Sequence, residues 1–516
     1  MKVPYTVLVI SLCIAVSRIS AAPINVYFVN ESGYSNNQVY IAWQNALAQQ
    51  STFDVSYGAG STPFSFGNAS NSNVITTNTA TLDSLGSSGM SMANVASGVL
   101  FISFGTQLAS TTNGPSITGS GATDYLTPYQ PLEVNYSSNS TSGGGDLTYI
   151  NVLTAPLRAA TYTGGTNGTL LQNKGLTTSA ASTASLISQV TAISGVNSNF
   201  IYNTNGNLVR IAGPGNYNPP AAFSQFPVMT EYLNHLQSNS VVTAVSNYNT
   251  FANSGTSPAT TTNYRFYANM GAKITNNYQA YLSGEITTYQ WTTNFSEGTA
   301  GPTFTNATIL VDATDATNFT ALAYAAAQPG TNIIFGGNGW NDFYSFVGSN
   351  GINGASNTFP QVPLADYYAA LIMGLAGSTV TNTASGDTMA IKDYATGHYW
   401  HNWTNPISFS DVQTNPDFYD QYGDVIYRNS TNTAYGYAYS DRFDYNSVLF
   451  TLGQLGPIGP GTNFDTLVIT IGVPTNAIPE ATTALYLTLG LVGFAVFMTN
   501  RRRVMHLTRK VALLLF

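Results

Sequence analysis

The feature of this sequence that most constrains its fold is a series of short strand-like runs separated by long polar connections. After Pro23, the runs 24–30, 38–44 and 98–105 are rich in β-branched and aromatic residues, which favour strands. The connections between them consist mainly of Ser, Thr, Asn and Gly, which favour turns and loops. This spacing predicts an antiparallel β-sandwich or barrel in the first part of the chain.

From about Ala180 the pattern becomes mixed. Apolar residues at helical spacing predict helices, and strand-like runs lie between and after them. The predicted helices are 184–194, 226–237 and 363–377, and the predicted strands are 278–291, 308–314, 425–429, 434–441, 447–453 and 467–473. The sequence therefore predicts a mainly β fold with an α/β part. Its domains are a β-sandwich over 23–165, completed by strands within 425–475, and a mixed α/β domain over 180–424.

Residues 1–22 have the pattern of a secretory signal peptide. Lys2 precedes an apolar run at 7–16, and the small residues 20–22 end the segment. Arg18 after the apolar run leaves an uncleaved membrane anchor as an alternative. Either interpretation predicts export of the chain.

Residues 476–516 form a separate C-terminal module. Pro479-Glu480 is followed by an apolar stretch at 484–498 and then by three consecutive arginines at 501–503. This arrangement resembles a PEP-CTERM sorting signal, a bacterial tail of Pro-Glu, transmembrane segment and Arg cluster. The resemblance implies at least transient membrane anchoring and a final location at the cell surface or in the extracellular matrix. A eukaryotic lipid-anchor tail is the alternative.

The charge of the body limits its partners. Seven of the 15 basic residues and one of the 23 acidic residues lie in the terminal segments, so the body carries 8 basic and 22 acidic side chains, a net charge near −14. An acidic body disfavours nucleic acid and anionic polymers, whereas a neutral polysaccharide is compatible with it. Only 7% of all residues are charged, which is typical of a secreted β-rich protein.

Cofactor chemistry has little support in the sequence. The single cysteine, Cys13, lies in the N-terminal apolar run, so a processed chain would have neither a disulfide nor a thiolate metal site. His398 and His401 have a spacing that can reach one metal ion, but no Cys or carboxylate partners lie nearby. We therefore predict no metal and no cofactor.

The stretch 131–157 presents an isolated carboxylate. It predicts strands at 132–136 and 147–153, joined by a Ser/Gly-rich connection. Strand alternation places Glu133 and Asn135 on one face and apolar residues on the other. A sugar-cleaving acid and an ordinary solvent-facing glutamate both fit this pattern.

Four segments in order resemble glycoside hydrolase family 64, the β-1,3-glucanases with a thaumatin-like fold. Glu133-Val134-Asn135 stands where the family has Glu-Phe-Thr, and 150–157 resembles Val-Asp-Phe-Val-Gly-Leu-Pro-Leu. Phe-Gly-Gly-Asn-Gly at 335–339 and Ala-Tyr-Gly-Tyr-Ala-Tyr-Ser-Asp at 434–441 resemble two later landmarks. The resemblance covers roughly 24–471.

This resemblance implies an inverting endo-β-1,3-glucanase with a thaumatin-like β-sandwich or barrel and a mixed α/β domain flanking a wide groove. Inversion requires one carboxylic acid and one carboxylate base. Glu133 stands at the acid position, but Asn151 stands where the family has its base Asp. A carboxamide cannot take up a proton near neutral pH, so hydrolysis is expected to be impaired.

Three explanations of Asn151 stay open: a glucan-binding relative without hydrolysis, Asp146 acting as the base, or a shifted register. The resemblance also implies sugar contacts from Asn135 and Thr148, and we add Asp146 and Trp340 as candidate substrate contacts. A non-catalytic glucan-binding protein, or a structural protein of the cell surface or matrix, is the rival function.

Overall fold

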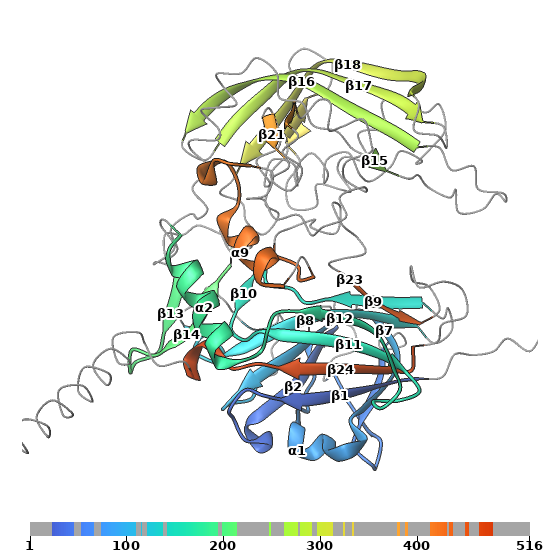
Figure 1. Cartoon of the computed structure of the whole chain (residues 1–516), viewed down its shortest axis with the longest axis vertical. Coiled ribbons are helices and arrows are strands. Elements are labelled where there is room, and N and C mark those ends of the chain that lie inside the picture. The colour runs from blue at the N-terminus through green and yellow to red at the C-terminus, as the bar shows by residue number, and fades with distance from the viewer. Residues whose placement is uncertain are drawn as a thin grey trace, which may run out of the picture.

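The computed structural model in Figure 1 confirms that the chain is mainly β. Its backbone is described over residues 23–45, 53–66, 74–109, 115, 121–137, 142–193, 199–213, 413–430, 433–436, 449–453 and 464–477, and over the strand residues 247–248, 263–276, 279–291, 297–312, 323–325, 333–334, 379–381 and 388–390. The two terminal segments, the histidine pair and Trp340 lie outside these residues. Within them, no helix is long and apolar enough to cross a membrane.

A large sheet of 13 strands dominates the fold. Its main path runs β12-β11-β24-β1-β7-β8-β9-β23, and β2 and β3 also pair with the long strand β7. The bounds of these strands are β1 Ile24–Asn30, β2 Val39–Asn45, β3 Phe53–Tyr57, β7 Met90–Phe104, β8 Tyr129–Ser137, β9 Ser142–Asp146, β11 Leu157–Thr163, β12 Thr169–Gly175, β23 Leu449–Gly453 and β24 Thr466–Ile471. Short strands β4 Thr62–Pro63, β5 Val74–Ile75 and β6 Ala80–Thr81 complete it.

The sheet is mixed rather than antiparallel. β24 pairs with β1 in parallel, from Asn25 opposite Thr466 to Asn30 opposite Ile471, and pairs antiparallel with β11 on its other side. The prediction of a purely antiparallel sheet is therefore wrong at this strand. A parallel partner needs a long crossover connection, and here most of the chain lies between the two strands.

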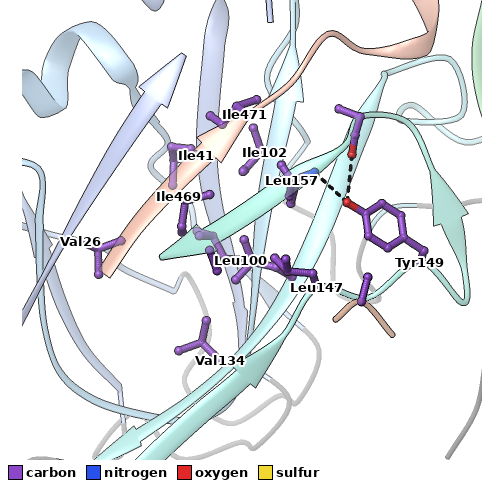
Figure 2. Close-up of a cluster of buried hydrophobic side chains, with 14 of the residues drawn as sticks. Val26, Ile41, Leu100, Ile102, Val134, Leu147, Tyr149, Leu157, Ile469 and Ile471 are labelled. Atoms are coloured by element: carbon purple, nitrogen blue, oxygen red, sulfur yellow. Dashed lines mark hydrogen bonds between the residues drawn. The ribbon is translucent and has the colours of Figure 1, made fainter. Parts of the chain in front are cut away.

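One core cluster joins the strands of this sheet. Figure 2 shows apolar side chains from β1, β2, β7, β8, β11 and β24 pointing toward one another. Members such as Ile41, Leu100, Ile102 and Ile469 are at most 1% exposed. Burying each such side chain contributes about 1.5–3 kcal/mol. Because strands far apart in the sheet order share this cluster, the sheet curls around its own core.

The remaining described elements form smaller units. A three-stranded sheet has the order β10-β14-β13, and β16, β17 and β18 lead a six-stranded sheet drawn apart from the large sheet in Figure 1. The bounds are β10 Val152–Leu153, β13 Phe200–Tyr202, β14 Leu208–Ala212, β15 Asn247–Tyr248, β16 Asn263–Asn276, β17 Gln279–Trp291, β18 Glu297–Asp312, β19 Ala323–Ala325, β20 Ile333–Ile334, β21 Thr379–Thr381 and β22 Thr388–Ala390. The helical elements are α1 Leu82–Leu85, α2 Ala180–Thr191, α9 Gln421–Ser430 and the 3-10 turns η1 Asn36–Gln38, η3 Gly86–Ser88, η6 Pro416–Phe418 and η8 Thr475–Ala477. The division into domains stays a prediction.

Two predicted elements are corrected by the structure. The strand after β8 is the Gly-rich segment Ser142–Asp146, not 147–153, which is irregular except for β10. The predicted strand 425–429 belongs to helix α9, because Tyr422, Val425 and Ile426 have the i, i+3, i+4 spacing of a buried helix face.

Asp465 fixes the turn between β11 and β12. Its carboxylate accepts hydrogen bonds from the backbone N–H groups of Gly164 at 2.7 Å and Gly165 at 3.1 Å, and from the Thr466 hydroxyl at 2.7 Å. Both glycines have positive φ angles, 87° and 80°, which other residues rarely adopt. Partial burial alone would raise the pKa of Asp465, but these hydrogen bonds outweigh it and lower the pKa.

We therefore expect Asp465→Asn to reduce the free energy of unfolding by about 1 kcal/mol at neutral pH. A lowered folded-state pKa means that the carboxylate stabilises the fold above the unfolded-state pKa and loses this effect as the pH falls through the folded-state pKa. The difference between variant and parent should therefore vanish in strong acid. Thermal unfolding from pH 2 to 7 checks this, with Asp54→Asn on β3 as an exposed control. A pH-independent difference would contradict the role of the carboxylate.

Candidate active site

The hairpin of β8 and β9 places two carboxylates opposite each other. In the antiparallel register, Glu133 of β8 is the direct partner of Asp146 of β9. Directly opposed residues share one face of a sheet, with Cβ atoms about 4.5–5.5 Å apart. The two carboxyl-bearing side chains therefore stand next to each other on one face of the sheet.

The two faces of β8 differ sharply in exposure. Leu132, Val134 and Tyr136 are buried in the core, whereas Glu133 and Asn135 are exposed on the other face. Asp146, on the same face as Glu133, is 8% exposed. We call the face that carries Glu133, Asn135 and Asp146 the carboxylate face.

Glycines keep side chains off part of the carboxylate face. Gly144 is the partner of Asn135 on this face, so nothing projects beside the amide there. Its neighbour Gly143 packs against β8, where an added Cβ would approach the Asn135 carbonyl oxygen to 2.5 Å. Only glycine permits this close approach, which explains why a Gly run forms a strand here. The result is a place beside Asn135 on this face where Gly144 contributes no side chain.

A small apolar cluster covers one end of the carboxylate face. Phe101, Tyr129 and Val152 are buried in this cluster, and Val99, the partner of Glu133 on β7, is half-buried beside it. Asn151 directly precedes Val152 and is exposed. The segment that carries Asn151 therefore lies where the exposed part of the face ends.

Gln130 holds the Asn151 segment in place. It is fully buried, and its Nε2 donates to the carbonyl oxygens of Thr148 at 3.0 Å and Val152 at 3.3 Å. Its Oε1 accepts from the backbone N–H of Thr154 at 2.8 Å. Gln130 lies three residues before Glu133, about 10 Å along a strand. One amide thus ties the Asn151 segment to the strand that carries the acid.

A buried arginine supports the covered end. Arg210 of β14 is fully buried, and its guanidinium lies 5.0 Å from the ring centroid of Tyr129 and 5.6 Å from that of Tyr125. Its Nη1 donates to the carbonyl oxygen of Thr127 at 2.7 Å. Burial lowers the pKa of Arg210, while Tyr129, Tyr125 and the carboxylate of Asp124 oppose that shift. These contacts join β14 to the start of β8.

Helix α9 packs against the segment that follows Asp146. The Tyr422 hydroxyl donates to the Tyr149 carbonyl oxygen at 2.7 Å. The Tyr435 N–H donates to the Leu147 carbonyl oxygen at 3.0 Å, and the Tyr149 N–H donates to the Tyr435 carbonyl oxygen at 2.8 Å. The Tyr149 hydroxyl accepts from the Leu157 N–H at 2.7 Å, as Figure 2 shows. Residues 147–157 are therefore held along most of their length.

A buried carboxylate caps α9. Asp420 is fully buried and accepts a hydrogen bond from the Tyr422 N–H at 2.9 Å. Burial raises the pKa of Asp420 to about 7, the N–H groups of Gly423 and Tyr422 oppose this rise, and the charge of Asp424 adds to it. Asp424 is itself paired with Arg428 at 2.8 Å. Asp420 is thus a titratable group close to the segment that follows Asp146.

Apart from Trp340, which lies outside the described residues, the predicted site residues fall into two groups. Glu133 and Asn135 lie exposed on one face, and Asp146 joins them there. Thr148 is 6% exposed, with its backbone bridged to Tyr435, and Asn151 lies at the end of the face. Since 147–151 is not a strand, alternation does not decide which way these two side chains point. The roles of all these residues stay predictions.

The residues that hold the site were not predicted. Gln130, Tyr149 and Tyr422 act through contacts between segments up to 273 residues apart in sequence. Only Asp420 left a local signal, because it precedes an amphipathic run as a helix N-cap does. Within the described part of the chain, no group of three or more His, Cys, Asp or Glu residues is placed to hold a metal ion.

The fold and the carboxylate face define a mainly β protein in which an exposed Glu133 is paired across two strands with a buried Asp146. No family model and no curated protein matches the sequence. A β-1,3-glucanase domain (GH64) from Clostridium beijerinckii is a solved structure with 13% identity and a TM-score of 0.47, and the match covers 87% of this chain and 98% of that one.

Two further solved structures are similar at low identity. A laminaripentaose-producing β-1,3-glucanase in complex with laminaritetraose is 13% identical with a TM-score of 0.46, covering 88% of this chain and 99% of that one. A GH family 64 laminaripentaose-producing β-1,3-glucanase from Paenibacillus barengoltzii, complexed with laminarihexaose, is 10% identical with a TM-score of 0.35, covering 87% and 75%. These proteins share little sequence with this chain, so the chemistry of the carboxylate face follows from its own residues.

Proposed function

We propose that this protein acts on β-1,3-glucan and hydrolyses it with inversion, using Glu133 and Asp146. The observation that carries the proposal is the cross-strand pairing of these two acids. The resemblance to β-1,3-glucanases supplies the substrate class. Because Asn151 stands where that family has its base Asp, the family's base position has no carboxylate in this chain. Asp146 is a second carboxylate on the same face as Glu133, so it can supply the base.

The proposed reaction transfers two protons, one to the leaving oxygen and one away from the attacking water. Protonated Glu133 donates its proton to the glycosidic oxygen as the bond from that oxygen to the anomeric carbon breaks. Ionised Asp146 removes a proton from a water molecule, which attacks the anomeric carbon from the opposite side of the sugar. The product has the α configuration, and the two carboxyl groups have exchanged protonation states. Asn151 donates its amide hydrogens to a sugar hydroxyl or a water.

The carboxylate face suits a neutral polymer. The register places Glu133, Asn135 and Asp146 there, with Gly144 beside them, and none of these residues is basic. Hydroxyl groups can donate to the carboxylates and to the Asn135 carbonyl oxygen, whereas an anionic polymer would be repelled. Gly144 leaves room for a sugar ring beside the Asn135 amide.

A second candidate function is glucan binding without hydrolysis. Asp146 is only 8% exposed, which limits the access of a water molecule to it. In that case Glu133 and Asn135 serve as hydrogen-bonding groups, and the protein holds glucan at the cell surface. The signal-like and sorting-like segments support export to the surface or matrix under either function. Fractionation of expressing cells tests the location, and retention in the cytosol would contradict it.

The full chain is expected to bind insoluble β-1,3-glucan in a pull-down and to be retained far less by cellulose or chitin. Gly144→Val should reduce the retained fraction at least tenfold, because its side chain would occupy the strip beside Asn135 while favouring a strand.

Gly60→Val is the matched control for this pull-down. An added Cβ at Gly60, in the turn between β3 and β4, meets no atom within 4 Å, so binding should be unchanged. Equal retention on all three polymers, or full retention of Gly144→Val, would contradict the proposed binding face.

A further inference from the structure

A pocket of about 300 Å³ lies between β1 and the turn that contains α1. Its lining includes the buried Leu82 and Leu85, and its other lining residues are Phe28, Asn30, Asn36, Asp83, Gly86 and Gly89. In Figure 1, α1 and β1 lie at the lower end of the large sheet, whereas β8, β9 and β23 lie at its upper side. The pocket is therefore separate from the carboxylate face.

The walls of the pocket are fixed by the backbone. Gly89 has a φ of 63°, and a Cβ added there would approach the Val26 carbonyl oxygen to 2.3 Å. The turn thus lies directly against β1. On β1, Val26 is buried, and Phe28, two residues later on the same face, is half-buried and packs against the core. Phe28 thus both packs against the core and lines the pocket.

Some polar groups of the pocket already form hydrogen bonds within the protein, and others can form them with a ligand. The Asn30 Nδ2 donates to the Tyr34 carbonyl oxygen and to Asn36 Oδ1, both at 2.8 Å, and its Oδ1 accepts from Ser32. Oδ1 of Asn36 is engaged by Asn30, whereas its Nδ2 donates to none of the described residues, so the Nδ2 hydrogens are available to a ligand. The carboxylate of Asp83 is exposed at the rim. The pocket thus offers an aromatic ring, an amide donor and a two-oxygen acceptor.

These groups select a class of ligand. No Lys or Arg lines the pocket, and Asp83 makes it acidic, so an anion is disfavoured. A volume of about 300 Å³ is at the lower end for ligand pockets and fits one sugar ring. A pyranose has an apolar C–H face for an aromatic ring and hydroxyl groups that both donate and accept.

We propose that this pocket binds one pyranose unit of a neutral sugar. The Phe28 ring contacts the C–H face of the sugar, Asp83 accepts hydrogen bonds from neighbouring hydroxyl groups, and the Asn36 amide donates to a third. The site holds sugar without cleaving it, since it has one carboxylate and no second acid. It is independent of the carboxylate face and of the function proposed for that face.

Saturation-transfer NMR on the full chain tests the proposal, with glucose and laminarihexaose as separate probes. Ring protons of the sugar should receive saturation, and Phe28→Ala and Asp83→Asn should each weaken binding at least tenfold. Asp83 is exposed, so its variant keeps the fold even if Phe28→Ala does not. Binding of glucose supports a free monosaccharide, and binding of laminarihexaose alone supports a unit of a glucan chain.

Two further variants separate this site from the rest of the surface. Val29→Ala changes an exposed residue on the opposite face of β1 and should leave the NMR signal intact. Gly144→Val, which blocks the carboxylate face, should leave the Asp83-dependent signal intact as well. The proposal is overturned if neither sugar gives a signal, or if the signal measured in the Gly144→Val background, where the carboxylate face is blocked, survives both Phe28→Ala and Asp83→Asn. Failure of glucan pull-down leaves these outcomes unaffected.

Discussion

Glu133→Gln and Asp146→Asn are each expected to reduce the release of reducing sugar from laminarin by about 10²- to 10⁴-fold, the usual contribution of a general acid or base. The carboxamides keep the size of the side chains but can neither donate nor take up the required proton. Release of sugar is measured as reducing ends, and NMR of the first product should show the α anomer. Asp54→Asn, an exposed change on β3, should leave the rate unchanged.

The two roles can be separated with a better leaving group. A dinitrophenyl laminarioside needs no proton at its leaving oxygen, so Glu133→Gln should cleave it at close to the parent rate. Asp146→Asn should be nearly inactive on both laminarin and the dinitrophenyl substrate, because hydrolysis of either one still requires activation of water. If Asp146→Asn instead cleaves the dinitrophenyl substrate at the parent rate and Glu133→Gln does not, Asp146 is the acid and Glu133 the base. Undiminished rates in both variants would refute the proposal that these two carboxyl groups catalyse hydrolysis.

Asn151 provides an independent test of the same pair. If Asp146 is the base, Asn151→Asp changes the rate by less than about tenfold, because no proton acceptor is missing. If the chain lacks a base, the same change should create activity that the parent does not have. The rate at which the parent chain hydrolyses laminarin separates the two functions: measurable hydrolysis supports the enzyme, and its absence together with glucan retention supports binding alone.

Much of the β architecture was predictable because local patterns encode it. Strands β1 and β2 and the second half of β7 have dense β-branched and aromatic residues, and α2 has a helical period, so each was found near its observed place, whereas the first half of β7, 90–97, was not predicted. β9 was missed because Gly-rich segments have low strand propensity. Its conformation depends on pairing with β8 and β23 on both sides, which no local pattern reveals.

The carboxylate pair was only half predictable for the same reason. Glu133 stands in a strand with clear alternation, so its exposed face followed from the sequence. Asp146 became its partner only through the register of the hairpin, which the strand prediction placed several residues too late. Once β9 is a strand, the pairing follows, because four residues between β8 and β9 fix the register.

The cap of α9 leads to the second large prediction. Asp420 is fully buried, and its Oδ2 has no hydrogen-bond partner among the described residues. Its pKa is about 7 in the folded chain against an ordinary value of 3.8. The group therefore favours the folded state most below pH 4, and this contribution is lost as the pH rises toward 7. Above pH 7 the fold carries a buried charge that the unfolded chain does not have to bury.

Asp420→Asn is therefore expected to stabilise the protein at pH 8, by up to about 4 kcal/mol, because each pKa unit is worth about 1.4 kcal/mol. Asn is also a good N-cap, so the bond from the Tyr422 N–H is retained. At pH 4 the gain should be absent or slightly reversed. Thermal midpoints measured from pH 4 to 8 give the difference curve, with the exposed Asp417→Asn as control. A constant difference across this range would show that Asp420 is ionised in the folded chain throughout, and that α9 holds the segment after Asp146 independently of pH.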